Sequence, residues 1–212
     1  IKYSSADKSL ESLLDDDIDL KSPVGLCSSG NDLFFTDSET NNIYKYNFDN
    51  EEATIINKTI QQPTGIIFIK EINELWVCET KNHRIVRLKL NGNIIGTFSQ
   101  RGIDAGQFNF PTFLCLGNDG NVYINDSMNF RIQVFSNEGK YLRQFGKAGD
   151  GSGDFARPKG IATDSFNNVY VVDALFNNVQ VFDHDGRLLY IFGEQGTDSE
   201  KFWLPAGIFI DD

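Results

Sequence analysis

The fold of this 212-residue chain is decided by the stretch Asn121-Val122-Tyr123-Ile124-Asn125-Asp126, followed by Asn129-Phe130-Arg131-Ile132-Gln133-Val134-Phe135. Both runs are rich in β-branched and aromatic residues, which fit the pleated surface of a strand. The equivalent run at residues 169–172 is apolar throughout, which is typical of strands buried on both faces. Similar pairs of runs recur along the chain, and the first run of each pair ends on an acid: Asp37, Glu79, Asp126 or Asp173.

Each recurrence opens on a proline, and most openings lie about 47 residues apart, a period typical of propeller blades. Glycine turns such as Asn91-Gly92, Glu138-Gly139 and Asp185-Gly186 separate the third and fourth runs and suit hairpins that need positive φ. The sequence therefore predicts an all-β chain, a β-propeller of four-stranded antiparallel blades with four complete blades and partial ones. The predicted blades start at Pro23, Pro63, Pro111, Pro158 and Pro205.

The segments outside the regular runs have their own patterns. Residues 1–22 precede the first blade; Ile1-Lys2-Tyr3 is a candidate outer strand, and Asp15-Asp16-Asp17-Ile18-Asp19 is predicted to be an acidic loop. The first blade lacks the glycine turn, which leaves its outer hairpin the least regular. We predict that the aromatic rings three residues before a proline fill the wedge between blades; these are Phe108, Phe155 and Phe202.

The composition excludes several classes of function. The net charge is −11 and the 19 basic residues are scattered, which argues against nucleic acid and favours a cationic partner. No run of about 18 apolar residues is present to span a membrane. Cys27, Cys78 and Cys115 have no metal-binding spacing, so zinc and covalent haem have no support, and no cofactor is predicted. We expect Cys27 and Cys115 to be buried thiols.

The turns between second and third strands and the loops between blades are predicted to emerge on one face. A catalytic residue should occur once, whereas the acid recurs in every blade, so we expect it to cap its own turn through backbone N–H groups. We predict no catalytic residue and no metal ligand. The candidate binding residues on this face are Glu79, Arg84, Asp126, Asn129, Arg131, Arg157, Lys159 and Asp173.

The order Pro-x-Gly-Ile, Val-Tyr-Val-x-Asp and Asn-x-Arg-Ile-x-Val-Phe, closed by a glycine turn, resembles the NHL repeat. The resemblance covers residues 23–212 and is best in the third unit, at residues 121–135. Residues 108–210 are similar to secreted or lipid-anchored bacterial NHL-repeat proteins, most specifically at 153–162 and 172–182. Such proteins usually close a ring of six blades, so the resemblance implies a six-bladed β-propeller and a chain truncated at its C-terminus.

The resemblance also implies a location outside the cytoplasm, periplasmic, cell-surface or secreted, with lipid anchoring as one form. Some relatives are encoded near multihaem cytochromes, so a redox-protein partner is one expectation. On this basis we predict a non-enzymatic protein-binding or scaffolding propeller that binds no nucleic acid. A structural component of a larger extracellular assembly is an alternative.

A second alternative is a metal-dependent hydrolase or lyase, because amidating lyases that use zinc and lactonases that use calcium resemble these blades. Zinc catalysis needs about three protein ligands, and this sequence has only His83 and His184. The predicted turns place these histidines at opposite ends of a blade. The inner strands offer Cys27, Ile67, Cys115 and Ala162, with no carboxylate before Asp164.

Overall fold

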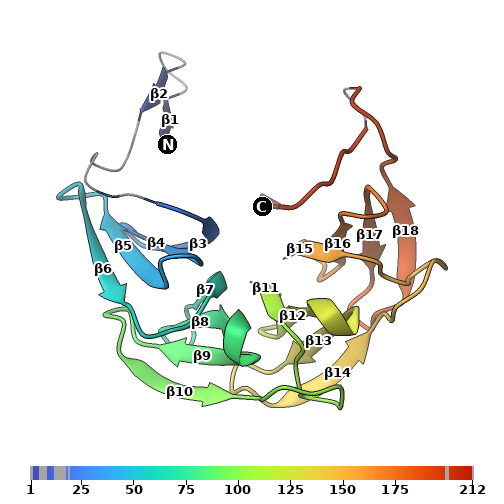
Figure 1. Cartoon of the computed structure of the whole chain (residues 1–212), viewed down its shortest axis with the longest axis horizontal. Helices are drawn as coiled ribbons and strands as arrows, with labels where there is room; N and C mark the ends of the chain where they lie inside the picture. Colours follow the sequence, from blue (N-terminus) through green and yellow to red (C-terminus); the bar gives the residue numbers. More distant parts are fainter. Residues whose placement is uncertain (1, 5–8, 12–17, 19, 199–200, 212) are drawn as a thin grey trace.

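The structure is a computed structural model that describes residues 2–4, 9–11, 18, 20–198 and 201–211. Four antiparallel sheets of four strands each are arranged as an open arc around a centre (Figure 1). The innermost strand of each sheet faces the centre, and the outermost strand lies at the periphery. The predicted all-β propeller of four-stranded blades is confirmed.

Each blade is a simple meander in which consecutive strands pair. From the centre outward the strands are β3 (Pro23–Ser29), β4 (Asp32–Asp37), β5 (Asn42–Asn47) and β6 (Glu52–Asn57); β7 (Pro63–Ile69), β8 (Glu74–Glu79), β9 (Arg84–Leu88) and β10 (Ile94–Phe98); β11 (Pro111–Leu116), β12 (Val122–Asp126), β13 (Arg131–Phe135) and β14 (Tyr141–Phe145); and β15 (Pro158–Thr163), β16 (Val169–Asp173), β17 (Asn178–Phe182) and β18 (Leu188–Phe192).

Two short 3-10 helices, η1 (Thr80–Asn82) and η2 (Ser127–Asn129), follow β8 and β12. They are the only helices in the part of the chain that the structure describes, and neither is long or apolar enough to cross a membrane.

The core lies between neighbouring blades, because each blade buries both of its faces. Phe108 and Phe155 are fully buried in these wedges, with ring centroids 5.5 Å from Phe135 and 5.6 Å from Phe182 respectively. Phe202 is partly buried and packs against the cluster of Val172, Val179 and Val181. The predicted wedge-filling role of these rings is confirmed.

The glycine two residues after the proline lets neighbouring inner strands approach closely. A Cβ atom on Gly25 would lie 2.3 Å from the Thr64 carbonyl oxygen, and one on Gly65 would lie 2.8 Å from that of Thr112. Gly160 meets the Ala206 carbonyl in the same way, at 2.7 Å. The Pro-x-Gly pattern is therefore a requirement of blade-to-blade packing rather than of a turn.

The three cysteines are free and pack into these wedges. Cys78 is buried, and Cys27 and Cys115 are partly buried against the clusters between the first and second and the third and fourth blades. Burial raises the pKa of the Cys27 thiol to about 12, so it behaves as a small apolar side chain.

The first blade is complete although it lacks the glycine turn. The Asn47 side-chain oxygen accepts hydrogen bonds from the backbone N–H groups of Asp49 and Asn50 at 3.0 and 3.2 Å, which is an Asx turn. Glu51 supplies the positive φ, at 56°. A local side-chain acceptor thus replaces the glycine of the other blades.

The N-terminal segment differs from the outer blade strand that we predicted at residues 1–3. Strand β1 (Lys2–Ser4) pairs with β2 (Ser9–Glu11) in a two-stranded sheet of its own, since closing a short local loop costs little entropy. Most of the predicted acidic loop lies outside the described residues. Its Ile18 packs, together with Leu20, against Phe35, Tyr44 and Tyr46 of the first blade.

Candidate functional site

One end of the propeller carries the turns after β4, β8, β12 and β16 and the connections between blades. We call this end the loop face; the opposite end, which carries the tight hairpins, is the hairpin end. The loop-face turns are residues 38–41, 80–83, 127–130 and 174–177, and the connections are residues 58–62, 99–110, 146–157, 193–198 and 201–204.

The recurring acids of the first and fourth blades cap backbone groups. Asp173 accepts hydrogen bonds from the N–H groups of Leu175 and Phe176 in its own turn, at 3.0 and 3.1 Å. It also accepts from Ala156 and Arg157 in the connection that precedes its blade, at 2.8 and 3.1 Å. Asp37 is bonded in the same manner to the equivalent four backbone groups. The predicted capping role is confirmed for these two acids.

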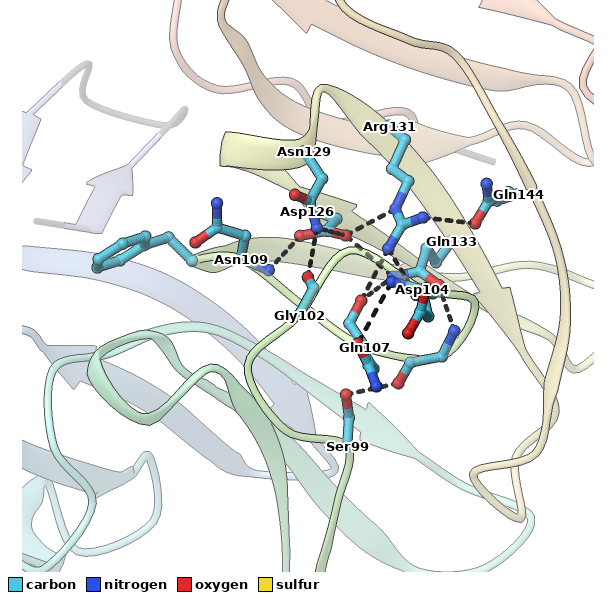
Figure 2. Close-up of polar contacts among 12 residues, drawn as sticks. Ser99, Gly102, Asp104, Gln107, Asn109, Asp126, Asn129, Arg131, Gln133 and Gln144 are labelled. Carbon is cyan, nitrogen blue, oxygen red and sulfur yellow. Dashed lines mark hydrogen bonds and ion pairs between the residues drawn. The ribbon is translucent and has the colours of Figure 1, made fainter.

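In the second and third blades the acid is held mainly by side chains (Figure 2). Asp126 accepts from the Asn109 N–H at 2.6 Å, and from Asn129 Nδ2, Arg131 Nε and Gln133 Nε2 at 2.8, 2.8 and 3.0 Å. The equivalent Glu79 accepts from the Gln61 N–H, Asn82 Nδ2 and Arg84 Nε. The difference follows from the sequence, since the residue five positions after the acid is arginine in these blades and asparagine in the other two.

Arg131 ties three segments of the third blade together. Besides Asp126, its guanidinium donates to the carbonyls of Asp104 and Gln107 and to Gln144 Oε1 on β14, all at 2.9 Å. Figure 2 shows this fork joining the strands to the 99–110 connection. Arg131 is a buried staple and is unavailable to a ligand.

Burial and donors act in opposite directions on these acids. Burial raises the pKa of Asp126, and the donors around it, Asn109 and Asn129 and Arg131, oppose that shift without cancelling it. For Asp37 burial also raises the pKa, but the four backbone donors outweigh it and the pKa is lowered. Hydrogen bonds that favour the charged form explain the second result.

A left-handed residue closes each loop-face turn and determines how the next blade begins. Asn41, His83 and Asn177, with φ of 62°, 54° and 54°, accept the N–H of the residue before the next proline, at 2.7, 3.0 and 2.8 Å. The equivalent Phe130 has the same φ of 54° but no acceptor. At that junction Arg157 instead donates its N–H to Asp173.

His83 is therefore a structural residue. Its Nδ1 accepts the Phe110 N–H at 3.0 Å, and its ring meets that of Phe110 at 4.4 Å. Burial lowers the pKa of His83 and the charge of Arg101 lowers it further, against the opposing effect of Asp126. His184 lies in the hairpin after β17, at the hairpin end. No group of three metal-ligating side chains occurs among the described residues.

The eight candidate binding residues fall into three groups. Glu79, Asp126, Arg131 and Asp173 are buried and bonded. Asn129 is partly buried and bonded to Asp126 and to the Gly102 carbonyl, and Arg84 pairs with Glu79 while remaining 39 % exposed. Arg157 is exposed and Lys159 partly exposed, and across the described residues neither side chain has a hydrogen-bond or ion-pair partner.

Sequence reasoning missed four exposed side chains on the same face. Met128 on η2 and Phe110 in the preceding connection are 54 % and 39 % exposed. Lys81 and Arg101 are exposed nearby. These positions vary from blade to blade, so the repeat gives no signal for them. The one signal in the sequence is that Met128 is the chain's only methionine.

Known proteins share this fold. A protein family described as "6-bladed beta-propeller" matches residues 114–186. No relative of curated function matches the chain in sequence. Among solved structures, virginiamycin B lyase from Staphylococcus aureus is 20 % identical with a TM-score of 0.62, over 81 % of this chain and 55 % of that one.

Two further structures show how widely the fold is used. A chain of a nidogen/laminin complex is 19 % identical with a TM-score of 0.67, over 85 % of this chain and 66 % of that one. Hydrazine synthase from Kuenenia stuttgartiensis is 15 % identical with a TM-score of 0.63, over 82 % and 49 %. This chain thus spans about half to two thirds of these structures. The four blades and the solved structures together show that this chain is a β-propeller, and the stretch at residues 114–186 is similar to a family of six-bladed propellers.

Proposed function

We propose that this protein is a non-enzymatic binding or scaffolding propeller that holds a protein partner on its loop face. The observation that supports this most is that apolar side chains, Met128 and Phe110, and cationic side chains, Arg101 and Arg157, are all exposed on that face. Methionine, aromatic and arginine side chains are enriched in protein interfaces. The recurring acids do not compete for this role, since they are buried in the scaffold.

The scaffold beneath these side chains is rigid, which favours binding. Met128 lies on a turn fixed by Asp126, and its own N–H donates to the Asn109 carbonyl at 3.0 Å. Phe110 is fixed by His83. Because the backbone is already ordered, binding loses little conformational entropy.

We extend the proposal to a location outside the cytoplasm, which rests on the NHL-like sequence pattern alone. A lipid-anchored form, a multihaem cytochrome as partner and a role within a larger extracellular assembly are narrower forms of it. Fractionation of cells of the source organism with an antibody to this chain tests the location. Recovery with cytoplasmic markers would contradict it.

Site-specific photo-crosslinking tests the binding function. A photoreactive amino acid replaces Met128 on the loop face or, as the control, Phe166, which is 83 % exposed in the turn after β15 at the opposite end. We expect one protein to crosslink from position 128 and not from position 166, and to bind the purified chain afterwards.

The enzyme alternative predicts a different outcome. A lyase among the solved structures shares this fold, and the competing hypothesis is the metal-dependent hydrolase or lyase that the sequence resemblance offered as an alternative. Metal analysis of the purified native protein, run beside the crosslinking, distinguishes the two. A stoichiometric tightly held ion, with no crosslink specific to position 128, would replace the scaffold proposal by the enzyme one.

A further inference from the structure

Resting on the proposed function, we infer that the segment bound at the loop face is an acidic stretch of a protein partner that also carries apolar side chains. The binding surface runs across the second to fourth blades. We call it the cationic strip, and its residues are Lys81, Arg101, Phe110, Met128, Arg157 and Lys159.

A chain of contacts connects the strip from the second blade to the third. Lys81 lies in η1, two residues before His83. The His83 ring contacts Phe110, and Arg101 is close enough to lower the pKa of that histidine. Phe110 follows Asn109, whose carbonyl accepts the Met128 N–H. Figure 1 shows the two short helices, η1 in green and η2 in yellow, on neighbouring blades.

A second set of contacts continues the strip to the fourth blade. Ser127, next to Met128, shares a hydrogen bond of 2.5 Å with Thr112. The Asn125 side chain then spans the junction, donating to the Lys159 carbonyl at 2.9 Å. Arg157 lies close enough to Lys159 to lower the pKa of its ammonium group, an effect to which burial contributes more.

The cations of the strip have no carboxylate partners of their own. Within residues 20–198 and 201–211, the side chains of Lys81, Arg101, Arg157 and Lys159 make no ion pair and no hydrogen bond. The buried acids beneath them are already neutralised by backbone groups and arginines. Asp104 is the exposed acid in the 99–110 connection, and its backbone carbonyl accepts a hydrogen bond from Arg131 Nη2, while Nη1 of the same guanidinium donates to Gln144 on β14.

Exposed acids lie at both ends of the propeller. Asp49, Glu51, Glu138 and Asp185 all lie exposed in the tight turns of the hairpin end. The loop face carries exposed acids as well, at Glu39, Asp104, Asp150, Glu194 and Asp198, so it is the strip of unpaired cations, and not the face as a whole, that offers positive charge to a partner. Charge complementarity then selects an anionic segment. The exposed Met128 and Phe110 side chains add apolar area, which favours a protein segment over a bare polyanion.

Fluorescence anisotropy tests the inference with a defined probe. The probe is a short fluorescein-labelled glutamate-rich peptide carrying two leucines. Its lysine-rich counterpart and an oligouridine of matched length serve as comparisons. We expect the glutamate-rich peptide to bind most tightly, and to bind more weakly as salt rises from about 50 to about 300 mM and shortens the Debye length.

Variants with the same change in charge locate the site. The double variant Arg157→Gln with Lys159→Gln removes two positive charges from the strip and should weaken peptide binding about tenfold. Lys89→Gln with Lys140→Gln removes two exposed lysines from the hairpin end and should leave affinity unchanged. Circular dichroism confirms that both variants are folded.

Three results would overturn the inference. They are tighter binding of the oligouridine or of the lysine-rich peptide, equal losses in the two double variants, and no binding of the glutamate-rich peptide at low salt. The proposed function survives each of them if a partner still crosslinks from position 128. It fails separately if no such crosslink forms.

Discussion

At the residue scale, three different blades use the side chain at one left-handed position to hold the start of the next blade. Asn41 and Asn177 use an amide oxygen and His83 uses Nδ1. To accept the hydrogen bond from the Phe110 N–H, His83 Nδ1 must carry no proton. A protonated imidazole would present two donors there, so the charged form is incompatible with this bond.

Substitutions at His83 test this role, and the chain itself supplies the matched controls. His83→Asn reproduces Asn41 and Asn177, and we expect it to keep the stability of the parent protein. His83→Phe reproduces Phe130, which has the same φ but no acceptor. It leaves the Phe110 N–H unpaired and should cost about 1–3 kcal/mol of unfolding free energy. Urea denaturation at neutral pH measures both.

The same histidine predicts a pH dependence. The pKa of His83 is lowered in the folded protein, so the unfolded chain binds its proton at higher pH than the folded one does. The stabilisation is complete above the unfolded pKa of about 6.5 and is lost as pH falls from there through the folded pKa. Unfolding free energies compared at pH 7.5 and pH 5.5 should fall more for the parent than for His83→Asn. An equal fall in both would refute this role.

The two arginine–acid pairs differ in burial and should differ in energetic weight. Arg131→Met leaves the fully buried Asp126 without its cation and should cost about 3–5 kcal/mol. Arg84→Met should cost only about 1–2 kcal/mol, because Arg84 is 39 % exposed and Glu79 keeps donors from Gln61 and Asn82. Chemical denaturation of both variants checks the order, and a reversed order would contradict the staple role of Arg131.

At the element scale, the repeat predicted the strands because the same residue types begin and end the strands in nearly every blade. The proline begins the inner strand, the acid ends the second, and a glycine closes the outer hairpin in three blades. The first blade shows where the pattern is insufficient, since Asn47 and Glu51 replace that glycine. Residues 1–22 carry no repeat, and their local hairpin was not foreseen.

Glycine at the blade junction allows a test at this scale. Gly65→Ala adds a Cβ atom 2.7 Å from Leu114 and 2.8 Å from the Thr112 carbonyl. Forcing the second and third blades apart should cost about 1–3 kcal/mol. Gly96→Ala in β10 is the control, because nothing lies within 4 Å of its new Cβ, and it should be neutral or slightly stabilising. Equal effects in thermal denaturation would refute close packing as the reason for Pro-x-Gly.

At the scale of the whole molecule, the composition gives the net charge but does not show where on the surface the charged side chains lie. A net charge of −11 favoured a cationic partner. In the structure exposed acids lie at both ends of the propeller, whereas the recurring acids of the loop face are buried. The sequence did identify Arg157 and Lys159 as candidates, since the repeat places them beside the proline. It could not identify Met128 or Arg101, because their exposure depends on how neighbouring blades pack.

Hydrogen–deuterium exchange with the glutamate-rich peptide tests the central claim, that the loop face is the binding surface, most directly. We predict that the peptide slows exchange in residues 108–110, 127–130 and 157–160, and leaves the hairpin turns at 49–51, 137–139 and 184–186 unchanged. Protection at those hairpin turns, or none at the loop face under saturating peptide, would contradict the account.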